Sequence, residues 1–176
     1  MSISAKIADW EREKLRKAWD PGRRLIQTIR RFQALRGKHG PVAWIARNYW
    51  RRAHQFWSVI TQNEIQLTTK IGGGLLLTHP NGIVIHPEAV IGPNCLIFNQ
   101  VTIGRGKAGP DGRTVPVIGG HVDIAAGARI VGGITIGNHA VIGLNAVVLS
   151  DVPDGGVAVG VPARVIRINP VPEDPA

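Results

Sequence analysis

An apolar residue recurs at every sixth position through most of this 176-residue chain. A six-residue period fits neither the 3.6-residue period of a helix nor the two-residue alternation of a strand. It fits short strands joined by tight turns in a stacked coil, in which each coil needs a neighbour to bury its apolar side chains. The residues on the period are Ile65, Ile71, Leu77, Ile85, Ile91, Ile97, Ile103, Ile118, Ile124, Ile130, Ile136, Ile142 and Val148.

Within these repeats, the fourth residue after each apolar position is usually small or branched. This second set consists of Ala89, Cys95, Val101, Val122, Ala128, Ile134, Ala140, Ala146 and Val152. The two sets together are typical of the hexapeptide repeat of a parallel β-helix. We therefore predict a mainly β fold, with a β-helix domain over residues 63–168 and a C-terminal tail over residues 169–176.

The period is interrupted twice, and both interruptions point to function. The first adds two residues around His79–Gly82. The second separates Ile103 from Ile118 by a segment rich in glycine and proline, which predicts an extruded loop over residues 104–117. Binding groups are often carried by a loop on a rigid scaffold.

Residues 1–62 differ from the rest of the chain in charge and aromatic content. The first sixty residues hold fourteen of the 21 Lys and Arg, four of the 12 acidic residues and all five Trp. Asp20-Pro21 predicts the start of a helix that ends near Gly37, and Gly40-Pro41 predicts the start of a second helix. In the second, apolar residues share one face, namely Val42, Ile45, Tyr49, Ala53, Phe56 and Ile60.

This basic helical segment has two interpretations. It is either an amphipathic cap over the open end of the coil that helps assembly, or a surface attracted to anionic lipid or an acidic polymer. Nucleic-acid binding is not expected, because no nucleic-acid motif accompanies the charge. No stretch approaches the roughly 20 apolar residues of a membrane span, and the N-terminus lacks the apolar core of a signal peptide. We expect a cytoplasmic protein, with peripheral contact at the inner face of the membrane as the alternative.

The histidines are the best candidates for chemistry. Cys95 lies at a small-residue position and is expected in the core, and no Cys/His cluster has the spacing of a metal site. His79 lies at the first interruption, where it could act as a general base. Glu64 lies close to one coil earlier and could orient its ring. The alternative is that both are polar turn residues; we expect three further histidines to face solvent, namely His86, His121 and His139.

Several motifs resemble those of the serine acetyltransferase branch of hexapeptide acyltransferases. The resemblance covers roughly residues 62–168, and its motifs lie at residues 70–85, 101–104, 126–133, 147–153 and 160–164. It implies a left-handed β-helix, assembled as a homotrimer whose active sites lie between subunits. It also implies acetyl-CoA as the acyl donor, lying along the edge of the coil.

The resemblance assigns roles to individual residues. His79 matches the histidine that deprotonates the acceptor hydroxyl, and Glu64 matches the acid that orients it, where serine acetyltransferases carry aspartate. Amides near Gly104 and Gly106 are expected to stabilise the oxyanion or hold the thioester. The positions matching CoA contacts are Ala126, Gly143, Leu144 and Arg164, of which Leu144 departs from the usual alanine.

Three departures from the family pattern concern the acceptor. Val115 replaces a loop histidine, Arg113 is displaced by one position, and Asn63–Gln66 replaces the usual Asp-Ile-His. This pattern, with the short basic front, looks more like capsule and exopolysaccharide O-acetyltransferases of the colanic-acid type. We therefore predict acetyl transfer to a carbohydrate hydroxyl, with Asn81 and Arg113 in acceptor binding. The alternatives are serine O-acetylation and a noncatalytic assembly module.

Overall fold

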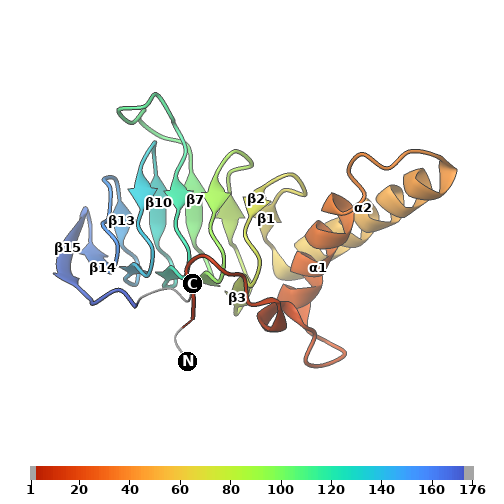
Figure 1. Cartoon of the computed structure of the whole chain (residues 1–176), viewed down its shortest axis with the longest axis horizontal. Helices are drawn as coiled ribbons and strands as arrows, with labels where there is room; N and C mark the ends of the chain where they lie inside the picture. Colours follow the sequence, from red (N-terminus) through yellow and green to blue (C-terminus); the bar gives the residue numbers. More distant parts are fainter. Residues whose placement is uncertain (1–2, 173–176) are drawn as a thin grey trace.

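A three-sided left-handed β-helix carries two helices at its N-terminal end (Figure 1). The structure is a computed structural model that describes residues 3–172. The predicted fold class is confirmed, including the helices at the front. Of the predicted tail, residues 173–176 lie outside the described residues.

Three parallel sheets form the sides of the coil. Sheet A consists of β1 (Glu64–Ile65), β4 (Val84–Ile85), β7 (Thr102–Gly104), β10 (Arg129–Val131) and β13 (Val147–Val148). Sheet B consists of β2 (Lys70–Ile71), β5 (Val90–Ile91), β8 (Val117–Ile118) and β11 (Thr135–Ile136). Sheet C consists of β3 (Leu76–Thr78), β6 (Leu96–Phe98), β9 (Asp123–Ile124), β12 (Val141–Ile142) and the closing antiparallel pair β14 (Gly156–Gly160) and β15 (Ala163–Ile168).

The predicted apolar period forms the core. Every residue on the period is buried except Leu77, which is half-buried and packs against the core, and the small-residue set is buried throughout. Strand pairing also reproduces the interruptions: Val84 stacks on Glu64 after twenty residues, whereas Thr102 stacks on Val84 after eighteen. The step from Thr102 to Arg129 is twenty-seven residues, because the loop is extruded there.

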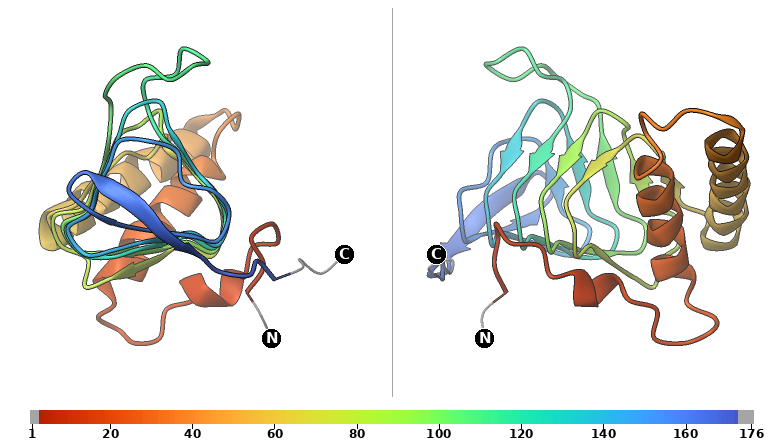
Figure 2. Two further views of the ribbon diagram at one scale, coloured as in Figure 1. Left: turned by 90° about the vertical axis from the view of Figure 1, so that its left-hand side faces the viewer. Right: turned by 45° about the vertical axis from the view of Figure 1, so that its right-hand side comes forward.

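The turns between strands stack at the three corners of the coil, as the axial view in Figure 2 shows. The loop corner joins sheet A to sheet B and comprises residues 66–69, 86–89, 105–116, 132–134 and 149–151. The clasp corner joins sheet B to sheet C and comprises residues 72–75, 92–95, 119–122 and 137–140. The histidine corner joins sheet C back to sheet A and comprises residues 79–83, 99–101, 125–128 and 143–146.

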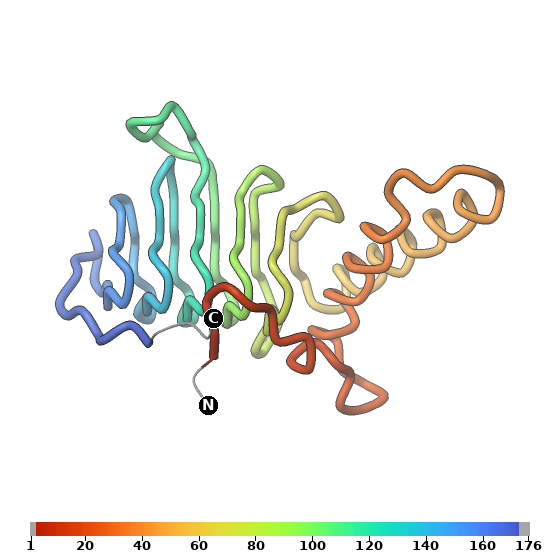
Figure 3. Tube along the Cα trace, viewed as in Figure 1, coloured from red at the N-terminus to blue at the C-terminus, as the bar shows by residue number. Residues whose placement is uncertain are grey.

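Helix α1 (Pro21–Gln33) closes the open end of the coil, and helix α2 (Pro41–Thr61) packs on α1, as the trace in Figure 3 shows. Leu25, Ile26 and Ile29 of α1 join the core. Both helices begin where the sequence predicts, although the Asp20 carboxylate binds Arg23 and does not cap α1 through a side-chain bond.

The apolar face predicted for α2 is not the face that packs inside the molecule. Its members Val42, Tyr49 and Phe56 are all more than half exposed. The buried side of the helix instead presents His54 and Thr61, which are polar. The reason is that His54 hydrogen-bonds to Thr28 of α1 and to the carbonyl of Ile65, and these bonds fix the rotation of the helix.

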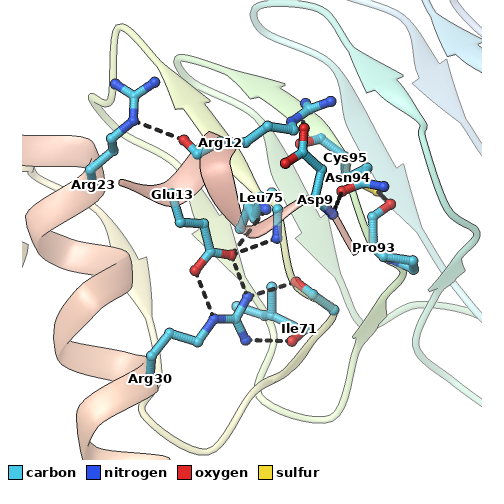
Figure 4. Close-up of polar contacts among 12 residues, drawn as sticks. Asp9, Arg12, Glu13, Arg23, Arg30, Ile71, Leu75, Pro93, Asn94 and Cys95 are labelled. Carbon is cyan, nitrogen blue, oxygen red and sulfur yellow. Dashed lines mark hydrogen bonds and ion pairs between the residues drawn. The ribbon is translucent and has the colours of Figure 1, made fainter. Parts of the chain in front are cut away.

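The segment of residues 3–20, here called the N-terminal clasp, runs along the clasp corner and includes a short 3-10 helix, Trp10–Glu13 (Figure 4). The side chain of the buried Asn94 accepts a hydrogen bond from the amide of Asp9 at 2.8 Å and donates hydrogen bonds to two carbonyls of the clasp. Glu13 accepts from the amides of Gly74 and Leu75 and pairs with Arg30 of α1. The clasp therefore ties the chain start to both the coil and α1.

Candidate active site

His79 lies in the widened turn of the histidine corner, between β3 and β4. Its backbone φ is +50°, a left-handed conformation that side chains rarely adopt, and its ring is exposed. Beyond it, the Asn81 side chain donates to the Gln62 side chain at 3.0 Å, at the end of α2. The turn thus sets an exposed histidine on a rigid corner, next to the junction of the helices and the coil.

Glu64 begins the first strand of sheet A at this same corner. Its amide donates to the carbonyl of Ile83 at 2.8 Å, and its side chain is exposed. Both Glu64 and His79 belong to the described part of the chain, and no hydrogen bond or ion pair joins their side chains there. The structure brings the two residues to one corner without forming the predicted dyad, which stays a prediction.

The residues matched to CoA contacts continue along the histidine corner, away from the helices. Ala126 lies two coils beyond His79, and Gly143 and Leu144 lie one coil further. Leu144 is 71% exposed. A side chain at Gly143 would meet Val159, because β14 packs directly over that glycine. Arg164 lies at the start of β15, with an exposed side chain that bonds to its own neighbouring carbonyl. Ala126, Gly143 and Leu144 therefore share the histidine corner with His79, whereas Arg164 lies on the last strand of sheet C.

The remaining predicted residues lie at the opposite edge of sheet A, at the loop corner. The Gly106 amide donates to the carbonyl of Thr114 at 2.9 Å, so it is engaged within the loop and is not a free donor for an oxyanion. Gly104 ends β7, and its carbonyl accepts from the amide of Gly132. One chain therefore does not bring Gly104 and Gly106 to His79.

Arg113 is also held within the loop corner. Its guanidinium bonds to Asp111 and, at 3.1 Å, to the hydroxyl of Thr135. The hydrogen bonds that Asp111 accepts from the side chain and the backbone amide of Arg113 hold the pKa of the Asp111 carboxyl below its usual range. The predicted acceptor-binding role of Arg113 therefore requires it to leave these partners.

A groove of about 440 Å³ lies between the loop and the coils that follow it. Its walls are loop residues 107–110 on one side and coil residues 131–134 and 149–151 on the other. Sequence reasoning missed this groove, although the Gly132-Gly133 pair carries a signal for it. A side chain at Gly133 would collide with the carbonyl of Arg113, so the loop can lie against the coil only where this residue is glycine.

A second cavity of about 400 Å³ lies between α1, α2 and the first coil, and Glu64 lines it. Polar side chains from α2 share its wall, namely Arg51, Gln55 and Ser58. Asn63, 4% exposed, also lines it, and its buried Nδ2 has no partner among the described residues.

Val115, which replaces the loop histidine of the family pattern, is buried.

Cys95 and three further histidines are buried or half-buried within the coil. Cys95 is fully buried, which confirms the expected core position, and this burial raises the pKa of its thiol to about 12. His121 and His139 were expected to face solvent, but they are half-buried and their Nδ1 atoms lie 2.8 Å apart. The stacking of successive coils brings them together. His86 is half-buried too, and its Nδ1 accepts the amide of Glu88.

Within residues 3–172, no group of three or more His, Cys, Asp or Glu side chains is arranged to hold a metal ion. Within the same residues, no helix combines the length and apolarity needed to cross a bilayer.

Comparison with known proteins places the chain among acyltransferases, although no family model matches it. It is 41% identical over 116 residues to a serine acetyltransferase of Helicobacter pylori strain J99, covering 66% of this chain and 67% of that protein. This chain belongs to the serine acetyltransferase family. A second member of the family, from Synechococcus elongatus, is 38% identical over 117 residues, which are 66% of this chain.

Solved structures of the family share the fold. The structure titled as a serine acetyltransferase complex with CoA superimposes with a TM-score of 0.68 at 32% identity, over 84% of this chain and 58% of that one. The chain spans 48% of the Synechococcus relative, so it corresponds to about half of some family members. The relatives' names do not support the prediction that the chain is nearest to capsule and exopolysaccharide enzymes.

Proposed function

We propose that this protein is an acetyl-CoA-dependent O-acetyltransferase, with L-serine as its acceptor. The observation that carries the proposal is the exposed His79 in the widened histidine corner, on the same edge as the positions matched to CoA contacts. Family membership supports the acyl donor, since one of the similar structures is a serine acetyltransferase complex with CoA. The relatives' names support serine.

His79 performs the proton transfers in this proposal. Its neutral imidazole removes the proton of the acceptor hydroxyl as the oxygen attacks the thioester carbonyl carbon. The new C–O bond gives a tetrahedral oxyanion, which collapses by breaking the C–S bond and expelling the CoA thiolate. The thiolate takes the proton from the imidazolium, leaving the acetyl ester, free CoA and neutral His79. Glu64 positions the ring from the first strand.

The site is completed by a second copy of the chain. The two edges of sheet A carry complementary halves: His79 at one edge, and the loop with its groove at the other. In a closed three-fold ring, the histidine corner of each subunit meets the loop corner of the next. This arrangement supplies the groove of one copy to the histidine of its neighbour, and it supports a homotrimer as the active form.

The donor and the acceptor have different surroundings in this arrangement. The groove has an apolar floor and Lys107 at its wall, which suits a pantetheine arm and a diphosphate. The acceptor approaches from the side of Glu64, where the second cavity offers hydrogen-bonding groups such as Gln55 and Ser58. The groove and the second cavity together are consistent with acetyl transfer from CoA to a polar hydroxyl compound.

A carbohydrate hydroxyl is the second candidate acceptor, favoured by the state of the loop. Val115 is buried and Arg113 is engaged by Asp111 and Thr135, so neither offers the loop contacts expected for an amino acid. The polar wall of the second cavity suits a sugar equally well. This candidate keeps the same donor, the same base and the same balance of protons.

Thiol release from acetyl-CoA by the purified protein tests these proposals. L-serine, a panel of sugar nucleotides and a panel of oligosaccharides are supplied in parallel. Turnover that depends on serine supports the first proposal, and turnover only with a carbohydrate replaces it with the second. Absence of thiol release with every acceptor, in a folded trimeric protein, contradicts both and favours the noncatalytic assembly module.

A further inference from the structure

Helix α2 exposes an apolar stripe that nothing in the described chain covers. Val42, Ile45 and Tyr49 begin it, and Phe56 and Ile60 continue it at helical spacing. Their exposed fractions run from 41% for Ile60 to 79% for Val42, and Val59 beside them is 75% exposed. An exposed apolar surface of this extent marks an interaction site.

The charge around the stripe is of one sign. Residues 21–63 contain nine Lys and Arg and no Asp or Glu. Among the described residues, only Arg23 and Arg30 of these nine pair with a carboxylate, on Asp20 and Glu13. Seven cations therefore lie on the two helices and their connection without an acidic partner, namely Arg24, Arg31, Arg36, Lys38, Arg47, Arg51 and Arg52.

This excess of positive charge indicates which kind of partner can bind the apolar stripe. A second copy of α2 would bring the same excess, and two such surfaces repel at contact distance. An anionic lipid surface accepts both features at once, because its acyl region takes apolar side chains and its headgroups attract the flanking cations. Exposed Tyr49 adds an amphipathic aromatic ring that suits the headgroup level.

We propose that α2 docks this protein on an anionic membrane surface, lying in the plane of the interface. The helix has 21 residues and is amphipathic, and it lies at the opposite end of the molecule from β15, so docking leaves the coil free (Figure 1). The contact is peripheral.

Vesicle co-flotation tests this surface directly in the wild-type protein. Vesicles of phosphatidylcholine alone are compared with vesicles that also contain phosphatidylglycerol, at low and high salt. The expected result is binding only to the anionic vesicles, weakened by salt because exposed charges are screened. Equal binding to both vesicle types, or no binding to either, overturns the proposal.

Two pairs of variants separate the apolar contribution from the charge. Ile45→Ser with Val59→Ser removes two exposed side chains of the stripe, and we expect at least about a tenfold loss of vesicle affinity. Lys38→Gln with Arg52→Gln removes two cations, and about a twentyfold loss is expected. Circular dichroism verifies that each variant folds.

The matched control lies at the other end of the coil. Ile166 and Ile168 on β15 are 66% and 62% exposed, so Ile166→Ser with Ile168→Ser removes similar apolar surface without touching α2. Vesicle binding by this control is expected to equal that of the wild type. A loss as large as that of the α2 variants contradicts the assignment to α2. A smaller oligomer mass for the Ile45→Ser, Val59→Ser variant in light scattering would show that another copy covers the stripe, and would likewise overturn the proposal.

Discussion

His79 owes its position to the two residues that widen its corner, and its chemistry can be tested by replacement. We expect His79→Ala to lower turnover by about 10²–10⁴-fold, since general-base catalysis contributes that much. Glu64→Gln should lower it less, because the glutamate acts only through the histidine. The comparison is made by thiol release at saturating acetyl-CoA, with circular dichroism verifying the fold.

His86→Ala serves as the matched control for this prediction. His86 also lies in a turn of the coil, and its ring accepts only the amide of Glu88. Its replacement should leave turnover close to that of the wild type. Wild-type rates in both His79→Ala and Glu64→Gln would refute the assigned roles.

His54 gives a second prediction at the scale of single residues, here for stability. Burial lowers the pKa of His54 below its ordinary value of 6.5, so the unfolded chain takes up a proton before the folded chain does. The free energy of unfolding should therefore fall as the pH is lowered through 6.5. Urea unfolding at a series of pH values measures this dependence.

A variant isolates the contribution of His54 from that of other titrating groups. His54→Gln should flatten the dependence below pH 6.5, whereas His39→Gln, at an exposed position, should leave it as in the wild type. If His54→Gln keeps the wild-type slope, the buried imidazole is not the group responsible.

The contacts of individual side chains were the least predictable part of the site. The sequence places Arg113 in a loop, but the side chain lies against Thr135 because the next coil stacks there, and no local pattern reports that stacking. Cys95 was predictable because its place in the repeat fixes its burial. His121 and His139 are a full coil apart in sequence, and their contact depends on the register between coils.

Among the elements, the N-terminal clasp joins the helices to the coil through a buried ion pair. Glu13 and Arg30 have side chains only 10% and 20% exposed, and each also bonds to backbone of the first coil. Glu13→Ala leaves the Arg30 guanidinium without its carboxylate partner. We expect it to lower the free energy of unfolding by about 3 kcal/mol in urea denaturation.

Glu11→Ala is the control for the clasp. Glu11 forms an ion pair with Lys14, but its side chain is 73% exposed. Exposed pairs contribute little, so this variant should change the free energy of unfolding by less than about 1 kcal/mol. Equal losses in the two variants would contradict the role given to the buried pair.

The elements also show where prediction from the sequence succeeds and where it fails. The strands were predictable because each apolar residue on the period has the same surroundings in every coil. The clasp was not, because residues 3–20 have no period and reach the coil through Asn94 and Glu13. For α2 the apolar face was found but its environment was left open between a cap and a lipid-binding surface, since periodicity identifies a face and not what covers it.

At the scale of the whole molecule, the two halves of the proposed site lie on different edges of sheet A. His79 and the positions matched to CoA contacts follow the histidine corner, while the groove and Arg113 belong to the loop corner. A single chain brings together only one half. The account therefore requires an assembly in which neighbouring chains complete each other's sites.

Complementation between two inactive variants tests this requirement most directly. Gly109→Val displaces the loop, because a side chain there would collide with the carbonyl of Gly133, and it should be inactive alone, as should His79→Ala. After the two are co-expressed in equal amounts, about a quarter of the sites in random trimers pair an intact His79 with an intact loop of the neighbouring chain. Acetyl-CoA cleavage should then return to about a quarter of the wild-type rate. A rate no higher than that of the separate variants would show that each site belongs to one chain, and would contradict the account.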